Sequence, residues 1–186
     1  MTGRILPRNF YARRAAEVAR DLLGKTLCHG NAAGRIVETE AYPGGDDLAS
    51  HSAVGITDRT RVIFGPPGHA YVYLCYGMYD CFNIIAETVG TPGCVLIRAL
   101  EPLSGLDEMR VRRPRAKSDR DLASGPGKLT MALAITRSHS GCDLTRGALV
   151  VRDAPDIADI ETTPRIGITK CADRLLRFLA RPDKLT

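Results

Sequence analysis

The sequence lacks several features that define common protein classes. No apolar run approaches the roughly 20 residues that a transmembrane helix needs, and no signal peptide opens the chain. The six cysteines form no Cys-x-x-Cys pair, so a zinc site is not expected. The chain also lacks internal repeats and low-complexity tracts. These absences predict a soluble intracellular protein with reduced thiols and with no metal or other cofactor.

Lysine is scarce: it supplies five of the 26 basic residues, and arginine supplies the rest. Basic residues exceed the 21 acidic ones, which gives a net charge of +5 and a sequence pI near 9.0. A positive balance favours a polyanionic partner, and the planar guanidinium group suits phosphate. A codon bias toward arginine would produce the same excess, so both explanations remain open. The length of 186 residues and the 44% hydrophobic content fit a single domain covering residues 1–186.

An acidic segment at residues 35–42 carries the strongest signal of chemistry. Its alternating pattern predicts a β-strand, in which successive side chains point to opposite faces. Two carboxylates two residues apart lie roughly 7 Å from each other, and each disfavours ionisation of the other unless a cation intervenes. The segment therefore fits either a general base or a half-exposed strand whose acids pair with arginines. The side chains expected on the acidic face are Ile36, Glu38, Glu40 and Tyr42.

Tyrosines concentrate in the segment 70–85, which holds four of the six in the chain. Alternation around a central glycine predicts a β-hairpin whose turn lies near Tyr76 and Gly77. Aromatic residues favour strands in general, which accounts for Tyr71 and Tyr79. Tyr76 differs, because a large aromatic side chain at a hairpin tip has no sheet to pack against. We interpret it as a candidate for insertion into another molecule, such as a stack of bases.

A third strand is predicted at residues 94–100, where an arginine interrupts an apolar row. Arginine among aliphatic side chains is usually paired with a buried acid, so we expect Glu40 or Glu38 to be the partner of Arg98. The side chains expected on one face of this strand are Cys94, Leu96, Arg98 and Leu100.

The remaining segments are expected to form the scaffold. Asn9 is placed as the cap of a helix that runs to about Leu23, and Ser104 with Asp107 as the capping box of a second helix. The stretch 43–68, which contains His51, is expected to be a long loop. Further strands are expected at 26–29, 148–152 and 165–168, a helix at 129–135, and a closing segment at 175–179.

Two segments have the composition of anion-binding regions. The stretch 110–117 is strongly basic, and the glycine-rich turn 124–128 precedes a predicted helix. Backbone donors at a helix N-terminus bind anions, but the turn lacks the spacing of a P-loop. For the turn, phosphate contact and plain capping are both open. We interpret the basic stretch as solvated, with phosphate contact as the alternative.

Several motifs follow one another across nearly the whole chain: Val37-Glu38-Thr39-Glu40-Ala41-Tyr42, His51-Ser52, Tyr71-Val72-Tyr73, Tyr76-Gly77-Met78-Tyr79, Asn83, Val95-Leu96-Ile97-Arg98-Ala99-Leu100-Glu101-Pro102 and Ser124-Gly125-Pro126. In this order and spacing they resemble the alkyladenine (3-methyladenine) DNA glycosylase family. The combination is far more specific than any one motif. The segment 112–121 and the tail after Arg165 match the family pattern only loosely, so no DNA contact is assigned to them.

The resemblance implies a monofunctional enzyme that flips an alkylated or deaminated purine out of duplex DNA. The enzyme would hydrolyse the N-glycosidic bond and leave an abasic site for base excision repair. The implied fold is a mixed α/β (α+β) domain with a curved, mostly antiparallel sheet that forms an open barrel, peripheral helices and a protruding β-hairpin. A small domain that encloses one base suggests a monomer. The implied location is the cytoplasm, at the nucleoid in a bacterium, or the nucleus in a eukaryote.

The resemblance also implies roles for individual residues. The family's catalytic glutamate corresponds to Glu40, and the arginine that holds it and the water corresponds to Arg98. The wedge that enters the minor groove corresponds to Tyr76. The asparagine that disfavours binding of guanine, through its amino group, corresponds to Asn83. The full set of base-pocket positions is Tyr42, His51, Tyr73, Asn83 and Leu96.

The same residues suit the chemistry of depurination. The transition state resembles an oxocarbenium ion, so a carboxylate near the anomeric carbon stabilises charge and deprotonates a water molecule. Aromatic faces can hold a flipped purine, and electron-rich rings favour cationic alkylated purines. Neutral deaminated purines need protonation of the leaving group, and the sequence offers no unambiguous acid. No lysine can be placed beside Glu40, which argues against a lyase activity.

Two other classes of protein remain open. An O-glycoside hydrolase could use Glu38 and Glu40 as its acid and base, but the aromatic hairpin tip and the positive charge would then be unexplained. A non-catalytic protein that binds damaged DNA would keep the basic surface and the wedge. Such a protein would not need a buried pair of Glu40 and Arg98.

Overall fold

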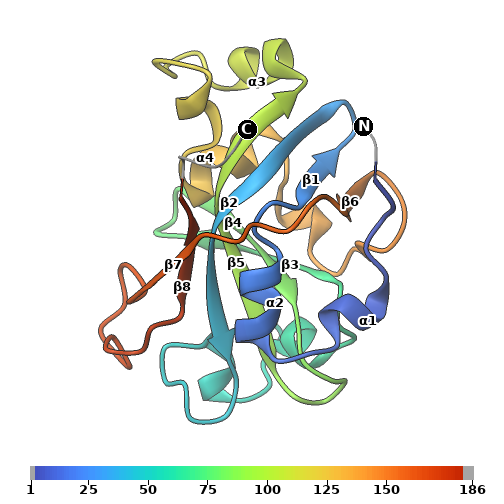
Figure 1. Ribbon diagram of the computed structural model, residues 1–186. Coiled ribbons are helices and arrows are strands. Elements are labelled where there is room, and N and C mark those ends of the chain that lie inside the picture. Colours follow the sequence, from blue (N-terminus) through green and yellow to red (C-terminus); the bar gives the residue numbers. More distant parts are fainter. Residues whose placement is uncertain (1–2, 182–186) are drawn as a thin grey trace.

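Eight β-strands form one sheet in the computed structural model, which describes residues 3–181. The main path through the sheet is β3-β4-β5-β2-β1-β6, and β8 pairs with both β2 and β7. Every pair is antiparallel, and the sheet curls into a half-barrel with the helices around it (Figure 1). The prediction of a mixed α/β domain with a curved antiparallel sheet and peripheral helices is confirmed.

The helices and strands follow one another in chain order, with short 3₁₀ turns between them. They are α1 (Arg8–Tyr11), α2 (Ala15–Asp21), β1 (Thr26–His29), β2 (Ala32–Pro43), β3 (Ala70–Cys75), β4 (Tyr79–Ile85), β5 (Gly93–Ser104), α3 (Leu106–Arg112), α4 (Pro126–Ala132), β6 (Leu149–Arg152), β7 (Ile160–Thr163) and β8 (Arg177–Ala180). No helix in the part of the chain described here is long and apolar enough to cross a membrane.

The acidic strand β2 lies at the centre of the sheet. It pairs with β5 from Ala33 to Pro43, and on its other edge with β1 and then with β8. Figure 1 shows it in blue, crossing the middle of the molecule. Because strands hydrogen-bond to both of its edges, the backbone under the two glutamates is fixed on each side.

A double irregularity in the pairing of β2 with β5 changes which side chains share a face. Ile36 lies opposite Leu100, but the register then shifts so that Val37 and Arg98 have no directly opposite partner. Such bulges rotate the strand locally and reverse the alternation of side chains. Ile36 and Leu100 therefore lie in the hydrophobic core. The prediction that they share a face with Glu40 and Arg98, respectively, was wrong.

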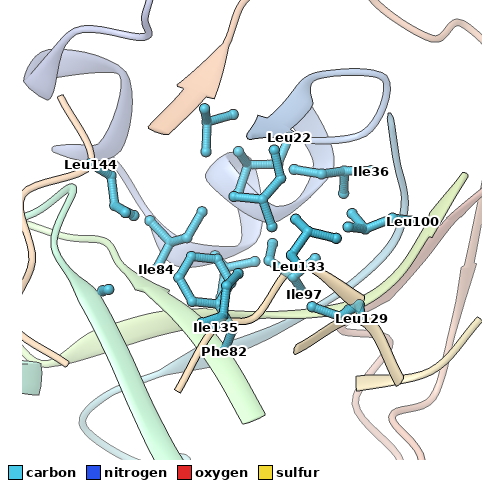
Figure 2. Packing of buried hydrophobic residues seen from close by; sticks show 14 of the residues in the cluster. Leu22, Ile36, Phe82, Ile84, Ile97, Leu100, Leu129, Leu133, Ile135 and Leu144 are labelled. Carbon is cyan, nitrogen blue, oxygen red and sulfur yellow. The ribbon is translucent and has the colours of Figure 1, made fainter. Parts of the chain in front are cut away.

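The hydrophobic core fills the side of the sheet that faces α2 and α4. Its side chains come from helices and strands between Leu6 and Phe178. Burial of each large one contributes about 1.5–3 kcal/mol to the stability of the fold. The opposite face of the sheet is therefore the one that is available for a binding site. Figure 2 shows Leu22, Ile36, Phe82, Ile84, Ile97, Leu100, Leu129, Leu133, Ile135 and Leu144 from this core.

The first predicted helix is divided into α1 and α2. Asn9 lies inside α1, whose N-cap is Pro7, so the predicted cap was wrong. The break follows from a tertiary contact with Glu87, whose backbone N–H donates to the Arg13 carbonyl at 2.9 Å. The Glu87 carboxylate accepts a hydrogen bond from the N–H of Ala15 at 2.7 Å and so begins α2. A distant acid thus sets the start of the helix, and the local sequence could not reveal it.

Other local predictions also need correction. The Ser104 hydroxyl donates to the Asn31 carbonyl at 3.0 Å, and α3 begins after Gly105, which has a positive φ of 71°, so no capping box with Asp107 forms. The residues 165–168 form a loop, and the strand in this part of the chain is β7. The helix α4 begins and ends three residues earlier than predicted.

The tyrosine-rich hairpin of β3 and β4 forms as predicted. Tyr76 and Gly77 both have positive φ, at 50° and 68°, and the Met78 N–H donates to the Cys75 carbonyl at 3.1 Å. This is the type I′ arrangement that matches the twist of a hairpin. Positive φ is uncommon for a tyrosine, and the side chain is 81% exposed. The hairpin therefore presents an aromatic ring to solvent at its tip.

Candidate active site

A cavity of about 530 Å³ opens on the face of the sheet opposite the core. The residues around it come from β2 to β5, from the hairpin turn, from the loop after β2, from the start of α4 and from the loop before β8. All predicted site residues except Glu40 line this cavity. The predicted residues on its wall are Tyr42, His51, Tyr73, Tyr76, Asn83, Leu96 and Arg98.

Glu40 lies behind the cavity wall, and its residue surface is fully buried. One carboxylate oxygen, Oε1, accepts a hydrogen bond from the backbone N–H of Ile166 at 2.8 Å. The other, Oε2, accepts one from the Tyr42 hydroxyl at 2.8 Å and lies 3.2 Å from the Arg98 guanidinium. Two hydrogen bonds and one ion pair therefore hold the carboxylate in one orientation.

Arg98 joins both glutamates of β2. Its Nε donates to Glu38 Oε1 at 2.8 Å, and Arg177 of β8 donates to the same oxygen at 2.7 Å. Burial acts to lower the pKa of Arg98, but the Glu40 carboxylate and the bond to Glu38 outweigh it and raise the pKa above its ordinary value. The expected pairing of Arg98 with an acid of β2 is confirmed for both acids.

Glu38 does not face the cavity that Arg98 lines. It lines a separate hollow of about 630 Å³ on the far side of its ion pairs. The two glutamates therefore do not share one open site, and the geometry does not favour their use as an acid and base pair on an O-glycoside.

Two of the tyrosine rings on the cavity wall, Tyr42 and Tyr73, each lie against an arginine. The Arg165 guanidinium lies over the Tyr42 ring at 4.6 Å, and the Arg59 guanidinium lies over the Tyr73 ring at 5.1 Å. Burial, and then the Glu40 carboxylate, raise the pKa of Tyr42 far above its ordinary value. Its hydroxyl therefore remains a hydrogen-bond donor to Glu40.

His51 stands at the start of a 3₁₀ turn in the long loop, just after Ser50, whose hydroxyl caps that turn. The ring packs edge-on against Tyr73 with centroids 4.6 Å apart, and Nδ1 is hydrogen-bonded to the Tyr71 hydroxyl at 2.9 Å. Burial, and then the Arg59 guanidinium, lower the pKa of His51 below its ordinary value. The ring is therefore uncharged at neutral pH.

Asn83 and Leu96 lie opposite each other on β4 and β5 and are both buried at the cavity. The Asn83 side-chain N–H₂ donates to the Tyr71 carbonyl at 3.1 Å and to the Cys81 carbonyl at 3.4 Å. These bonds fix the orientation of the amide. The shape of the cavity at this point is therefore rigid.

Sequence reasoning missed several residues around the cavity. Tyr71 was accounted for by strand propensity alone, although its position two residues before Tyr73 was a signal that both share one face. Arg165 was assigned to a strand, but it forms a fully buried ion pair with Asp47 at 2.6 Å and also donates to the Ala41 carbonyl. No local pattern indicates this contact, because the two charges lie 118 residues apart.

The chain was compared with known protein families and with curated proteins. Residues 9–184 match the family described as "Methylpurine-DNA glycosylase (MPG)". Among curated proteins, the chain is 52% identical over 178 residues to a protein of Methanocella arvoryzae, covering 93% of this chain and 89% of the relative. It is 51% identical over 187 residues to one of Methanoculleus marisnigri (96% and 96%) and 48% identical over 183 residues to one of Koribacter versatilis (94% and 88%). Each relative carries the name "Putative 3-methyladenine DNA glycosylase".

The fold, the cavity and these matches define a DNA glycosylase, an enzyme that hydrolyses N-glycosyl bonds in DNA repair. The chain belongs to the methylpurine-DNA glycosylase family, which acts on alkylation damage. The resemblance found in the sequence is confirmed.

Proposed function

We propose that this enzyme flips one damaged purine from duplex DNA into the 530 Å³ cavity and hydrolyses its N-glycosidic bond. The products are the free base and an abasic site. The observation that carries the proposal is the buried Glu40 carboxylate, which is paired with Arg98 on the wall of an aromatic cavity. Both alkylated and deaminated purines are substrates in this proposal.

Glu40 activates the attacking water in this mechanism. A carboxylate has about four lone-pair sites, and hydrogen bonds from Ile166 and Tyr42 use two of them, while Arg98 forms an ion pair with Oε2. A remaining site accepts a proton from water as the sugar develops positive charge. Arg98 lines the cavity and contacts Glu40, and it orients both the carboxylate and the water. The surrounding protein supplies a low-dielectric site, in which this charge stabilisation is strong.

The base occupies the space between the aromatic side chains. Tyr42, Tyr73 and His51 supply ring surfaces on which a flipped purine stacks. The fixed amide of Asn83, together with Leu96, limits which purine edges fit. A normal base pair also costs more to open than a damaged one, which adds selectivity before the base reaches the cavity.

Tyr76 acts as the wedge that replaces the flipped base in the duplex. Its ring is exposed at the hairpin tip and also borders the cavity. A rigid aromatic side chain at this place can fill the gap in the stack and keep the nucleotide flipped.

The partner in this proposal is duplex DNA, which the net charge of +5 favours. One protein molecule, folded as one domain, encloses one base, so the enzyme acts as a monomer. It works where the DNA is, at the nucleoid in the cytoplasm of a bacterial or archaeal cell. The reaction is monofunctional, because no lysine lines the cavity in the described part of the chain.

Replacement of Glu40 by glutamine tests the mechanism. The E40Q variant should bind lesion-containing duplex as the unmodified enzyme does, but it should release base about 10²- to 10⁴-fold more slowly, because the proton acceptor is lost. Single-turnover excision from a duplex with one modified purine measures the rate. Glu101→Gln, a change at a half-exposed acid of β5, is the matched control.

Near-normal release of base by E40Q would reject the assignment. Tight binding by the unmodified protein without any abasic product would instead support a non-catalytic damaged-DNA binding protein.

A further inference from the structure

The charged groups on the cavity wall are unevenly balanced. The wall carries two guanidinium groups, those of Arg59 and Arg98, and no carboxylate. Arg98 is compensated by Glu38 and Glu40 behind it. Within residues 3–181, by contrast, no carboxylate pairs with Arg59, and Asp58 beside it lies 3.2 Å from Arg61 instead. The Arg59 charge is therefore the uncompensated one at the cavity.

Arg59 is also in direct contact with the aromatic wall. Its guanidinium lies 5.1 Å from the centroid of the Tyr73 ring, so the ring already interacts with a cation. Tyr42 has the same relation to Arg165, at 4.6 Å, but Asp47 neutralises that arginine. Only the Tyr73 side of the cavity combines an aromatic surface with an unpaired cation among the described residues.

The effect of this charge extends across the cavity wall to the neighbouring histidine. After burial, Arg59 is the next cause of the lowered pKa of His51. A positive charge that disfavours protonation of the imidazole also disfavours a second cation in the same cavity, since both are governed by the same Coulomb interaction.

We propose that Arg59 is a specificity-determining residue, which lowers the affinity of the site for positively charged alkylated purines relative to neutral damaged purines. The inference rests on the proposed function of the cavity. A purine nucleotide methylated at N3 or N7, such as 7-methylguanine, carries a positive charge on the base, whereas hypoxanthine is neutral. The unpaired charge repels the first and leaves the second unaffected. The discrimination belongs to binding of the flipped base and is separate from the chemistry at Glu40.

The test compares two duplexes that differ only in the lesion, one with 7-methylguanine and one with hypoxanthine. Arg59→Met removes the charge and keeps an aliphatic side chain against Tyr73. Arg59→Lys keeps the charge. Arg61→Met removes an exposed charge two residues away and serves as the matched control. Dissociation constants are measured for each lesion against an undamaged duplex, and single-turnover release of base is measured alongside.

The ratio of the two dissociation constants should shift in favour of 7-methylguanine by about three- to tenfold in Arg59→Met, as expected for removal of one partly screened charge. It should stay unchanged in Arg59→Lys and Arg61→Met. Because the same duplexes are used throughout, other differences between the two bases cancel.

An equal loss of affinity for both duplexes in Arg59→Met would overturn the inference, because it would indicate that Arg59 contacts the DNA backbone. An unchanged ratio would overturn it as well. If the unmodified protein releases neither base, the proposed function fails and this inference fails with it. Release of base with an unchanged ratio refutes the role of Arg59 alone.

Discussion

His51 is held uncharged by its surroundings, and this has a consequence for stability. Its pKa in the folded protein lies below the ordinary value, first because of burial and second because of Arg59. The hydroxyl of Tyr71, which faces the imidazole, has a raised pKa, caused mainly by burial, and does not titrate in the same range. At pH values between the pKa of His51 in the folded protein and its pKa in the unfolded chain, the unfolded chain binds more protons than the folded one. This residue therefore makes stability rise with pH up to about 6.5 and has no such effect above it.

The change His51→Gln tests this at the residue scale. The free energy of unfolding of the unmodified protein should fall more between pH 7.5 and pH 5 than that of the variant, because only the histidine gains a proton on unfolding. Urea denaturation followed by circular dichroism at the two pH values measures the difference. Identical pH dependence in both proteins would show that His51 titrates alike in the folded and unfolded chain.

Single residues differ in how far the sequence could predict their surroundings. The pairing of Arg98 with Glu40 or Glu38 was predictable, because an arginine among aliphatic side chains is usually paired with a buried acid. The contact between Ile166 and Glu40 was not predictable, because a backbone N–H carries no signature in the sequence. The same holds for Arg165 and Asp47, whose pairing depends on how two distant loops meet.

The hairpin of β3 and β4 is the element with the clearest separation of stability from function. Its strands are fixed by pairing with each other and with β5, while the Tyr76 ring at the tip is 81% exposed. Tyr76→Ala should therefore change the free energy of unfolding, measured by urea denaturation, by no more than about 0.5 kcal/mol, as for other exposed substitutions. The same change should impair base flipping, because the wedge is lost.

A fluorescent reporter base placed beside the lesion measures flipping in the Tyr76→Ala complex. Met78→Ala, at a residue that is 67% exposed in the same turn, is the control for damage to the turn itself. Equal reporter fluorescence in complexes of the unmodified enzyme and Tyr76→Ala would argue against the wedge.

Elements were predictable where local patterns decided them. Alternation identified β1, β2, β5 and the hairpin, since a half-buried strand must alternate. The patterns failed where a distant residue or a change of register intervened. Glu87 begins α2 from another part of the chain, and the register shifts at Val37 and Arg98 reverse the faces of Ile36 and Leu100. Neither effect leaves a trace in the period of the hydrophobic residues.

At the scale of the whole molecule, one core connects the two ends of the chain. The main hydrophobic cluster runs from Leu6 to Phe178, and β2 bonds to β1, β5 and β8. We therefore expect a single cooperative unfolding transition. The chain has no tryptophan, so tyrosine fluorescence and circular dichroism are the two probes to compare. Coincident curves are expected in urea, and two separate transitions would indicate two folding units.

The hydrogen bond between Glu40 and Ile166 spans 126 residues. During synthesis, the glutamate therefore leaves the ribosome long before the amide that orients it. A truncated translation product that stops before β7 contains all the aromatic residues of the cavity and lacks the amide that binds Glu40 Oε1. The Glu40 carboxylate therefore has its complete set of partners only after the loop before β8 has been synthesised.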